Sequence, residues 1–160
     1  MRFCPACGTP LTLSQQGNAT RPTCPACGFV SFADPKVAVA VVITSAAGVL
    51  LGRRCNDPGR GRWALPAGYV DRGEVLEVAA AREAREELNV DVRIDCLIGL
   101  YSAAGDPVVL AVYAATIIAG EPQAGDDLDA VAYFRLDALP ELAFARDAEI
   151  VQNQRVRTAR

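Results

Sequence analysis

The chain has 160 residues, a net charge of −3 and a pI of about 5.0. This length allows one core-bearing domain with a small appendage, and the acidic balance argues against a general nucleic-acid binder. No run approaches the ~20 apolar residues that span a bilayer, and the N-terminal MRFCPACG has no apolar signal region. We therefore expect a cytoplasmic protein with no membrane partner. The chain has no histidine, so acid–base or metal chemistry must rest on carboxylates, cysteines or water.

Residues 1–35 contain the motif Cys-Pro-Ala-Cys-Gly twice. The first copy holds Cys4 and Cys7, the second holds Cys24 and Cys27, and 16 residues separate them. Two such motifs at this separation are typical of a zinc ribbon with four thiolate ligands. Two disulfides are the alternative, which a cytoplasmic location disfavours. We expect a structural Zn²⁺, because four thiolates leave no open position for a catalytic water.

After Pro35, the sequence predicts a second domain over residues 36–160. Two segments rich in β-branched residues, Lys36–Thr44 and Val49–Arg54, predict neighbouring strands joined by a turn. Further elements are expected as strands over Val90–Ile94, Leu97–Tyr101, Val108–Ile118 and Ala130–Leu136 and as a closing helix over Phe144–Val156. This mixture of strands and helices predicts an α/β fold.

A helix predicted from near Glu74 to near Leu88 carries an acidic cluster. With Glu83 as the reference, Glu87 lies about 40° to one side and Glu86 about 60° to the other. Three carboxylates at this spacing repel one another, and a bound Mg²⁺ or Mn²⁺ would relieve the repulsion. The alternative is a solvated helix whose charge is offset by two arginines, Arg82 and Arg85.

The order of these residues resembles the Nudix box. It runs from Gly68 through five residues to Glu74, then seven residues to the segment 82–87 (REAREE), one residue, and Asn89. Asn89 is the one departure, since the family usually has Gly there. Asn is the commonest other residue in the left-handed conformation, so we expect Asn89 to end the helix. The resemblance implies an α/β/α sandwich with a mixed sheet, preceded here by the zinc ribbon.

The resemblance also implies a metal-dependent hydrolase site. The implied ligands of Mg²⁺ or Mn²⁺ are the Gly68 carbonyl, Glu83, Glu86 and Glu87. Glu83 is either a ligand or the base, and Glu74 and Arg82 are implied as a pair that orients the loop. A further acid from outside the box is expected at Asp127, with Asp126 and Glu141 as rivals. Three arginines before the box are candidates to face a pyrophosphate, with a solvated loop as the alternative: Arg53, Arg54 and Arg62.

A zinc ribbon followed by a Nudix box resembles NADH pyrophosphatases and a related group that cleaves ADP-ribose or FAD. The first group carries an SQPWPFPxS signature after the box, which residues 101–107 (YSAAGDP) lack. Pro107 lies close to where ADP-ribose pyrophosphatases tend to carry a proline. The expected activity is therefore hydrolysis of ADP-ribose or FAD with release of AMP, with NADH or NAD-capped RNA as alternative substrates.

A non-catalytic nucleotide-binding module, whose ribbon is an interaction surface, is the alternative of another class. The complete glutamate set argues against this alternative, since a site that no longer catalyses a reaction would tend to lose carboxylates that repel one another. The expected partner is a small nucleotide and not a nucleic acid, and the resemblance is compatible with a homodimer.

Overall fold

The computed structural model describes the backbone of residues 1–158 and the side chains of residues 1–153. The chain divides into two compact units, Met1–Pro35 and Lys36–Arg160. In the first unit, strands β1 (Thr12–Gln16) and β2 (Ala19–Thr23) form an antiparallel hairpin. Within the described residues, neither helix has the length and apolarity needed to span a bilayer.

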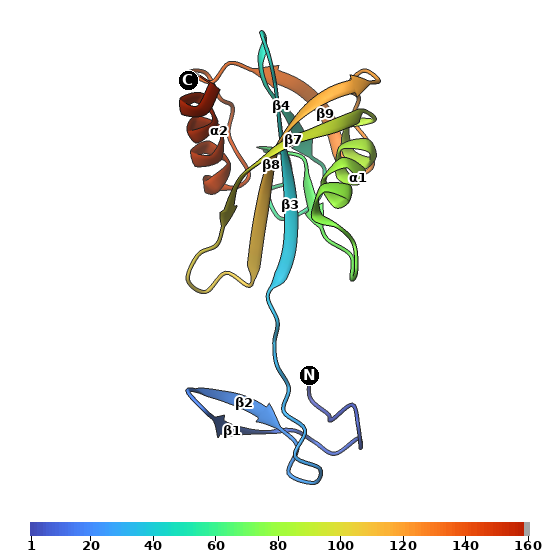
Figure 1. Cartoon of the computed structure of the whole chain (residues 1–160), viewed down its shortest axis with the longest axis vertical. Helices are drawn as coiled ribbons and strands as arrows, with labels where there is room; N and C mark the ends of the chain where they lie inside the picture. The colour runs from blue at the N-terminus through green and yellow to red at the C-terminus, as the bar shows by residue number, and fades with distance from the viewer. Residues whose placement is uncertain (159–160) are drawn as a thin grey trace. The chain divides into compact units, whose positions relative to one another are not determined.

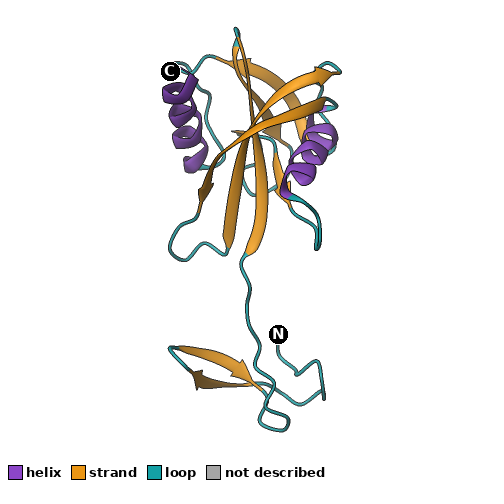
Figure 2. Cartoon of the chain, in the orientation of Figure 1, coloured by secondary structure: helices purple, strands orange, loops and turns teal. Residues whose placement is uncertain are grey.

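The second unit is a seven-stranded mixed sheet with two helices (Figures 1 and 2). Its central strand, β3, pairs in parallel with β8 and antiparallel with β4 and β6. Strand β7 extends the sheet beyond β8, while β5 and β9 pair with β4. The elements in chain order are β3 (Lys36–Ser45), β4 (Gly48–Arg54), β5 (Trp63–Ala64), β6 (Ala67–Tyr69), α1 (Leu76–Leu88), β7 (Asp91–Tyr101), β8 (Val108–Ala119), β9 (Leu128–Phe134) and α2 (Ala145–Thr158).

Strand β3 is buried on both of its faces, which explains its nearly continuous apolar sequence. Successive side chains of a strand point to opposite faces. Val39 and Val41 lie in the core that α1 covers, whereas Ala40 and Val42 lie in the core that α2 covers. Figure 1 shows the two helices on opposite sides of the strands. Each fully buried apolar side chain stabilises this arrangement by about 1.5–3 kcal/mol. The result is the expected α/β/α sandwich.

Helix α1 begins at Leu76, two residues later than the predicted start near Glu74. Val75 is extended, and the Glu74 amide donates to the Asp71 carbonyl at 3.0 Å in the turn before the helix. At the other end, Asn89 adopts the left-handed conformation with φ 57° and ψ 33°, and its amide donates to the Arg85 carbonyl at 3.0 Å. The predicted helix end at Asn89 is confirmed.

The prediction of two short strands after the helix is wrong, because β7 is continuous. Its pairing with β8 shifts register at three places, between Asp91 and Val92, between Ile94 and Cys96, and between Leu97 and Gly99. Such bulges insert extra residues without ending a strand, and they break the alternation that a sequence pattern needs.

Other bounds differ by one or two residues. Strand β8 ends one residue later than predicted, and β9 begins at Leu128, two residues early, because Leu128 pairs with Arg54 beyond a register shift. Strands β5 and β6 were not predicted, since two and three residues are too few to show a periodicity.

Asp147 is a buried carboxylate in α2. It is 4% exposed, and one of its oxygens accepts the Leu65 amide at 3.2 Å. Burial raises the pKa of Asp147 to about 6, although the Leu65 amide and the charges of Arg146 and Arg54 oppose the shift. The folded protein therefore holds a proton at this carboxyl over a pH range in which the unfolded chain has lost it.

Asp147→Asn should flatten the pH dependence of stability. An ordinary Asp has a pKa near ~3.9, so the folded state binds more protons than the unfolded state between about pH 4 and 6. Stability is thus lost as the pH rises through that window. Measured by urea unfolding, the free energy of unfolding of the variant should rise by up to about 3 kcal/mol relative to that of wild type between pH 4 and pH 7. Glu149→Gln, at an exposed site of the same helix, is the matched control. Parallel profiles for Asp147→Asn and wild type would contradict the assignment.

Candidate active site

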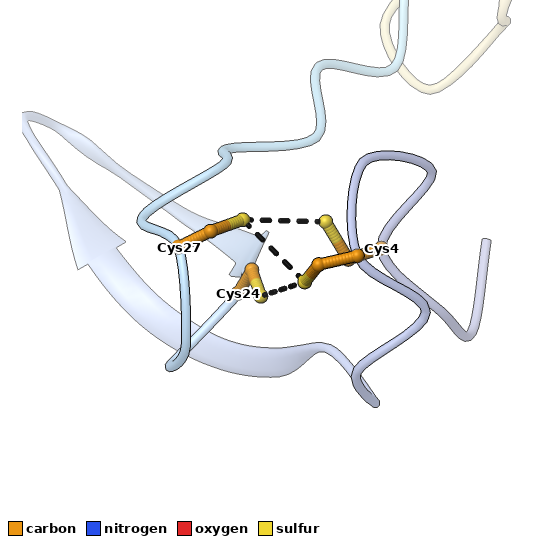
Figure 3. A group of neighbouring side chains, drawn as sticks. Cys4, Cys24 and Cys27 are labelled. Atoms are coloured by element: carbon orange, nitrogen blue, oxygen red, sulfur yellow. Dashed lines mark hydrogen bonds between the residues drawn. The ribbon is translucent and has the colours of Figure 1, made fainter.

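The four cysteines of the first unit converge on a common centre. Figure 3 shows the sulfurs of Cys4, Cys24 and Cys27 turned toward one another. Cys4 Sγ lies 3.6 Å from Cys27 Sγ, Cys7 Sγ lies 3.5 Å from Cys24 Sγ, and all four sulfurs lie within 4.8 Å of one another. A tetrahedral Zn²⁺ with Zn–S bonds of about 2.3 Å places its sulfurs about 3.8 Å apart, whereas a disulfide requires about 2.05 Å. The spacing fits a structural Zn²⁺ and excludes disulfides among these cysteines.

The two cysteine motifs have the same backbone geometry. The Gly8 amide donates to the Cys4 carbonyl at 2.9 Å, and the Gly28 amide donates to the Cys24 carbonyl at 3.0 Å. Both glycines have positive φ, 71° and 77°, which strains any residue with a Cβ. The repeated sequence thus folds into repeated turns that each present two thiols to the same centre.

In the second unit, three of the glutamates of α1, Glu83, Glu86 and Glu87, line a cleft of about 380 Å³. Glu83 and Glu87 are buried, at 8% and 7% exposure, whereas the Glu86 side chain is half exposed. Five further residues line the cleft from β6 and the loop before β9: Ala67, Gly68, Tyr69, Asp126 and Asp127. The structure therefore brings the predicted glutamates, Gly68 and Asp127 together.

Arg82 is the counterion of this cluster. Its guanidinium donates to both carboxylate oxygens of Glu74, at 2.8 and 2.9 Å, so the expected pair is present. It also donates to Glu83 at 2.7 Å, to Glu86 at 3.0 Å and to the Tyr69 carbonyl at 3.1 Å. The hydrogen bonds from Arg82 lower the pKa of Glu74 to about 2. The network ties α1 to the loop that precedes it.

Arg85 does not share in this network, although the sequence offered it as an offsetting charge. It forms an ion pair with Asp91 at the start of β7. The offset comes from Arg82, and the cluster lies in a cleft and not on a solvated helix face.

Burial keeps two of the glutamates from ionising readily. It raises the pKa of Glu83 against the opposing effect of Arg82, and it raises the pKa of Glu87 to about 7 although the Ala67 amide donates to that carboxylate at 3.0 Å. Like charges in a partly buried site are unfavourable without a cationic partner. Carboxylate oxygens clustered in this way are the ligands that Mg²⁺ and Mn²⁺ prefer, so the residues present fit such an ion.

Gly68 lies directly against the Glu83 carboxylate. In β6 it stands opposite Val39 of β3. A Cβ at this position would lie 2.0 Å from Glu83 Oε1 and 2.1 Å from Cδ, inside the van der Waals limit. Only glycine leaves Glu83 in its observed place. That the Gly68 carbonyl binds metal stays a prediction.

Gly68→Ala should weaken Mn²⁺ binding by about 10–100-fold, the range seen when groups supporting metal ligands are lost. The added methyl forces Glu83 away from Glu86 and Glu87 while the sheet stays paired. Titration calorimetry with Mn²⁺ measures the effect. The matched control is Gly99→Ala in β7, where the new Cβ would meet only the Tyr101 ring, at 3.4 Å. Wild-type affinity in Gly68→Ala would show that Glu83 is not a ligand.

Two of the three candidate acids from outside the helix reach the cleft. Asp126 and Asp127 both line it, and Asp127 accepts a hydrogen bond from Asn56 at 2.6 Å. The loop that carries them packs closely on α1, because the Gly125 amide donates to the Glu87 carbonyl at 2.8 Å. The third candidate, Glu141, forms an ion pair with Arg62 at 3.0 Å and is not among the residues lining the cleft.

The three candidate arginines are placed differently. Arg53 forms an ion pair with Asp129 at 2.6 Å, and Arg62 pairs with Glu141, so both already have acidic partners. Arg54 donates from Nε to the Pro58 carbonyl at 2.7 Å and lines a second pocket. Arg54 is thus the one of the three that lines a pocket next to the glutamate cleft among the residues that the structure describes.

The second pocket, of about 630 Å³, adjoins the cleft and shares Ala67, Gly68 and Tyr69 with it. Its other walls include residues of β3 and β8, Phe144 just before α2, and Arg146 in the first turn of α2. Sequence reasoning missed this pocket. The one available signal was an aromatic and a basic residue at the opening of the predicted closing helix.

Comparison with known proteins places this geometry in a family. The NUDIX domain model matches residues 34–154, which is most of the chain. The chain belongs to the NUDIX family of hydrolases. A second model, a zinc ribbon described as Nudix N-terminal, matches residues 2–32 of this NUDIX protein.

Among curated proteins, the ADP-ribose pyrophosphatase of Methanocaldococcus jannaschii is 40% identical over 114 residues, covering 69% of this chain and 68% of that protein. The NAD-capped RNA hydrolase NudC of Pseudomonas aeruginosa is 32% identical over 147 residues, covering 91% of this chain and 51% of that protein. This NUDIX chain thus spans about half the length of the NudC relatives it matches.

Among solved structures, a NUDIX hydrolase from Nitrosomonas europaea superposes with a TM-score of 0.87 at 31% identity. The superposition covers 95% of this chain and 89% of the Nitrosomonas europaea chain. Such coverage takes in residues of both units of this NUDIX protein.

Proposed function

We propose that the chain hydrolyses the pyrophosphate bond of a nucleoside diphosphate linked to another moiety, with ADP-ribose or FAD as substrate and AMP as a product. The observation that carries the proposal is the convergence of Glu83, Glu86 and Glu87 on Gly68, in a cleft that opens into a larger pocket. The cleft has the size and charge to hold metal-bound phosphates, and the pocket can hold an attached group. The 40% identical relative named ADP-ribose pyrophosphatase supports this substrate class.

The carboxylates of α1 would hold Mg²⁺ or Mn²⁺. When bound, such an ion neutralises charge on the pyrophosphate oxygens and lowers the pKa of a bound water. Glu83 lies between Gly68 and Arg82, where it can serve as a ligand or accept a proton from that water. Arg82, anchored on Glu74, keeps Glu83 and Glu86 oriented. The chain has no histidine, so the base is a carboxylate or the bound hydroxide.

A second candidate is hydrolysis of NAD-capped RNA or NADH. The NudC relatives of Pseudomonas aeruginosa and Stutzerimonas stutzeri match 91% and 88% of the chain, across both the ribbon and the hydrolase unit, which favours this candidate. The missing signature in residues 101–107 and the acidic pI of about 5.0 weigh against it. In either case a cytoplasmic location fits a chain in which none of the six cysteines forms a disulfide.

Product analysis by chromatography tests the proposal. The full chain is incubated with Mg²⁺ or Mn²⁺ and, separately, with ADP-ribose, FAD, NADH, diadenosine polyphosphates and NAD-capped RNA. AMP is expected from ADP-ribose or FAD, and Glu86→Gln should reduce its release to a small fraction of the wild-type rate. Preferential release from NAD-capped RNA or NADH would select the second candidate. No turnover of any substrate with either metal would leave a non-catalytic nucleotide-binding module.

A further inference from the structure

The larger pocket contains a wall that the proposed hydrolysis does not use. The ring of Phe144 is contacted by two guanidinium groups: Arg54 Cζ lies 5.4 Å from the ring centroid and Arg146 Cζ lies 5.5 Å from it. Asp106 adds a carboxylate to the lining of this pocket. The rest of the lining is mainly apolar and includes Val108 and Leu110. Flat aromatic and guanidinium surfaces in an apolar pocket suit a planar heterocycle, whose faces are apolar and whose edge is polar.

Arg146 has donor capacity left over. Its Nε is buried and has no hydrogen-bond partner within the part of the chain that the structure describes. Its Nη1 forms an ion pair with Asp106 Oδ2 at 3.4 Å. A buried donor without an acceptor is unfavourable and rare in folded proteins. The Arg146 side chain as a whole is 31% exposed, so the terminal amino groups of its guanidinium, and not the buried Nε, are the donors that a molecule bound in the pocket would meet.

The position of the wall fixes which part of a substrate it meets. The pocket and the glutamate cleft meet at Ala67, Gly68 and Tyr69. If Mg²⁺ or Mn²⁺ on the α1 carboxylates holds a pyrophosphate beside Gly68, one of its two substituents is directed into the pocket. Arg54 is among the residues that line the pocket.

We propose that Phe144 and Arg146 bind the nucleobase of the substrate. The base packs flat against the wall formed by Arg54, Phe144 and Arg146, and the Arg146 guanidinium donates to a ring nitrogen or carbonyl on its edge. This inference rests on the proposed function for the identity of the ligand, and it adds Arg146 as the residue that selects the base. A substituent without a heterocycle gains nothing from this wall.

Binding of AMP and of ribose 5-phosphate to the full chain tests the proposal without requiring turnover. The two molecules share a phosphate and a ribose, so their difference isolates the base. Titration calorimetry with Mg²⁺ present should show AMP binding about tenfold or more tightly than ribose 5-phosphate, the range of a stacked base. Arg146→Gln and Phe144→Leu should each remove most of that preference and leave ribose 5-phosphate binding unchanged. Arg135→Gln, at an exposed ion pair with Asp137, is the matched control.

The unchanged ribose 5-phosphate affinity serves as the check that each variant is folded, and Arg146→Lys provides a second substitution that keeps the charge but loses the planar fork. Equal binding of AMP and ribose 5-phosphate by wild type would overturn the inference, as would a base preference that survives in both variants. A base preference lost in both variants, together with no turnover of any dinucleotide, would support the pocket and refute the hydrolase.

Discussion

Replacing Glu86 with Gln is expected to lower the rate of pyrophosphate hydrolysis by about 10³-fold. The amide has the shape of the carboxylate but no negative charge, so it would remove a proposed metal ligand, and a bound metal ion contributes several kcal/mol to stabilising the transition state. Glu86 is half exposed, and its partner Arg82 retains Glu74 and Glu83. The loss should therefore fall on catalysis and leave the fold intact.

Single-turnover kinetics at saturating Mg²⁺ measures this change. The same measurement repeated at high Mn²⁺ shows whether a weakened metal affinity is the cause. Glu77→Gln is the matched control, because it makes the same change at an exposed position in the first turn of α1. Its rate should stay within about twofold of wild type, as surface substitutions rarely do more. Near-normal activity of Glu86→Gln would remove Glu86 from the site.

The second large effect is expected in the zinc ribbon. Cys24→Ser should release Zn²⁺ and unfold residues 1–35 while the sheet and helices of the hydrolase unit persist. The regular structure of the ribbon is one hairpin of two five-residue strands, β1 and β2, and domains below about 40 residues rarely fold without a metal or disulfides. A structural Zn²⁺ contributes about 10–16 kcal/mol in such units. The two hydrophobic cores contain only residues from Ala38 onward.

Zinc content by mass spectrometry and hydrogen exchange by residue measure both parts of this expectation. Amides of β1 and β2 should lose protection, and those of β3 and β8 should keep it. Cys96→Ser, which changes an exposed free thiol in β7, should change neither the zinc content nor the protection of these amides. If Cys24→Ser retains zinc and the ribbon amides stay protected, Cys24 is not needed to hold the ion.

The parts of the site that could be predicted are those that lie close together in the chain. Glu83, Glu86 and Glu87 share one turn of a helix, so spacing alone places them on one face. The four cysteines occur in two copies of one short motif, which marks them as a set. The left-handed Asn89 follows from the same local geometry.

The second pocket could not be predicted, because its walls meet only after folding. Arg54 lies at the end of β4 and Arg146 in α2, and nothing in the spacing of 92 positions between them indicates a shared aromatic neighbour. The partners of the arginines before the box could not be predicted for the same reason. Whether Arg53 faces solvent, a phosphate or Asp129 depends on a strand that follows it by more than 70 residues.

The guanidinium of Arg82 occupies the centre of the acidic cluster and makes its charges tolerable before any ion arrives. With Arg82 in this position, we expect the hydrolase unit to keep its fold when Mg²⁺ is absent. Two kinds of chelator should then have different effects. One that removes only a bound Mg²⁺ should stop turnover reversibly and lower the melting temperature only by the loss of a ligand of the native state, whereas one strong enough to take Zn²⁺ should unfold the ribbon. Free Mg²⁺ could therefore regulate activity while the protein stays folded.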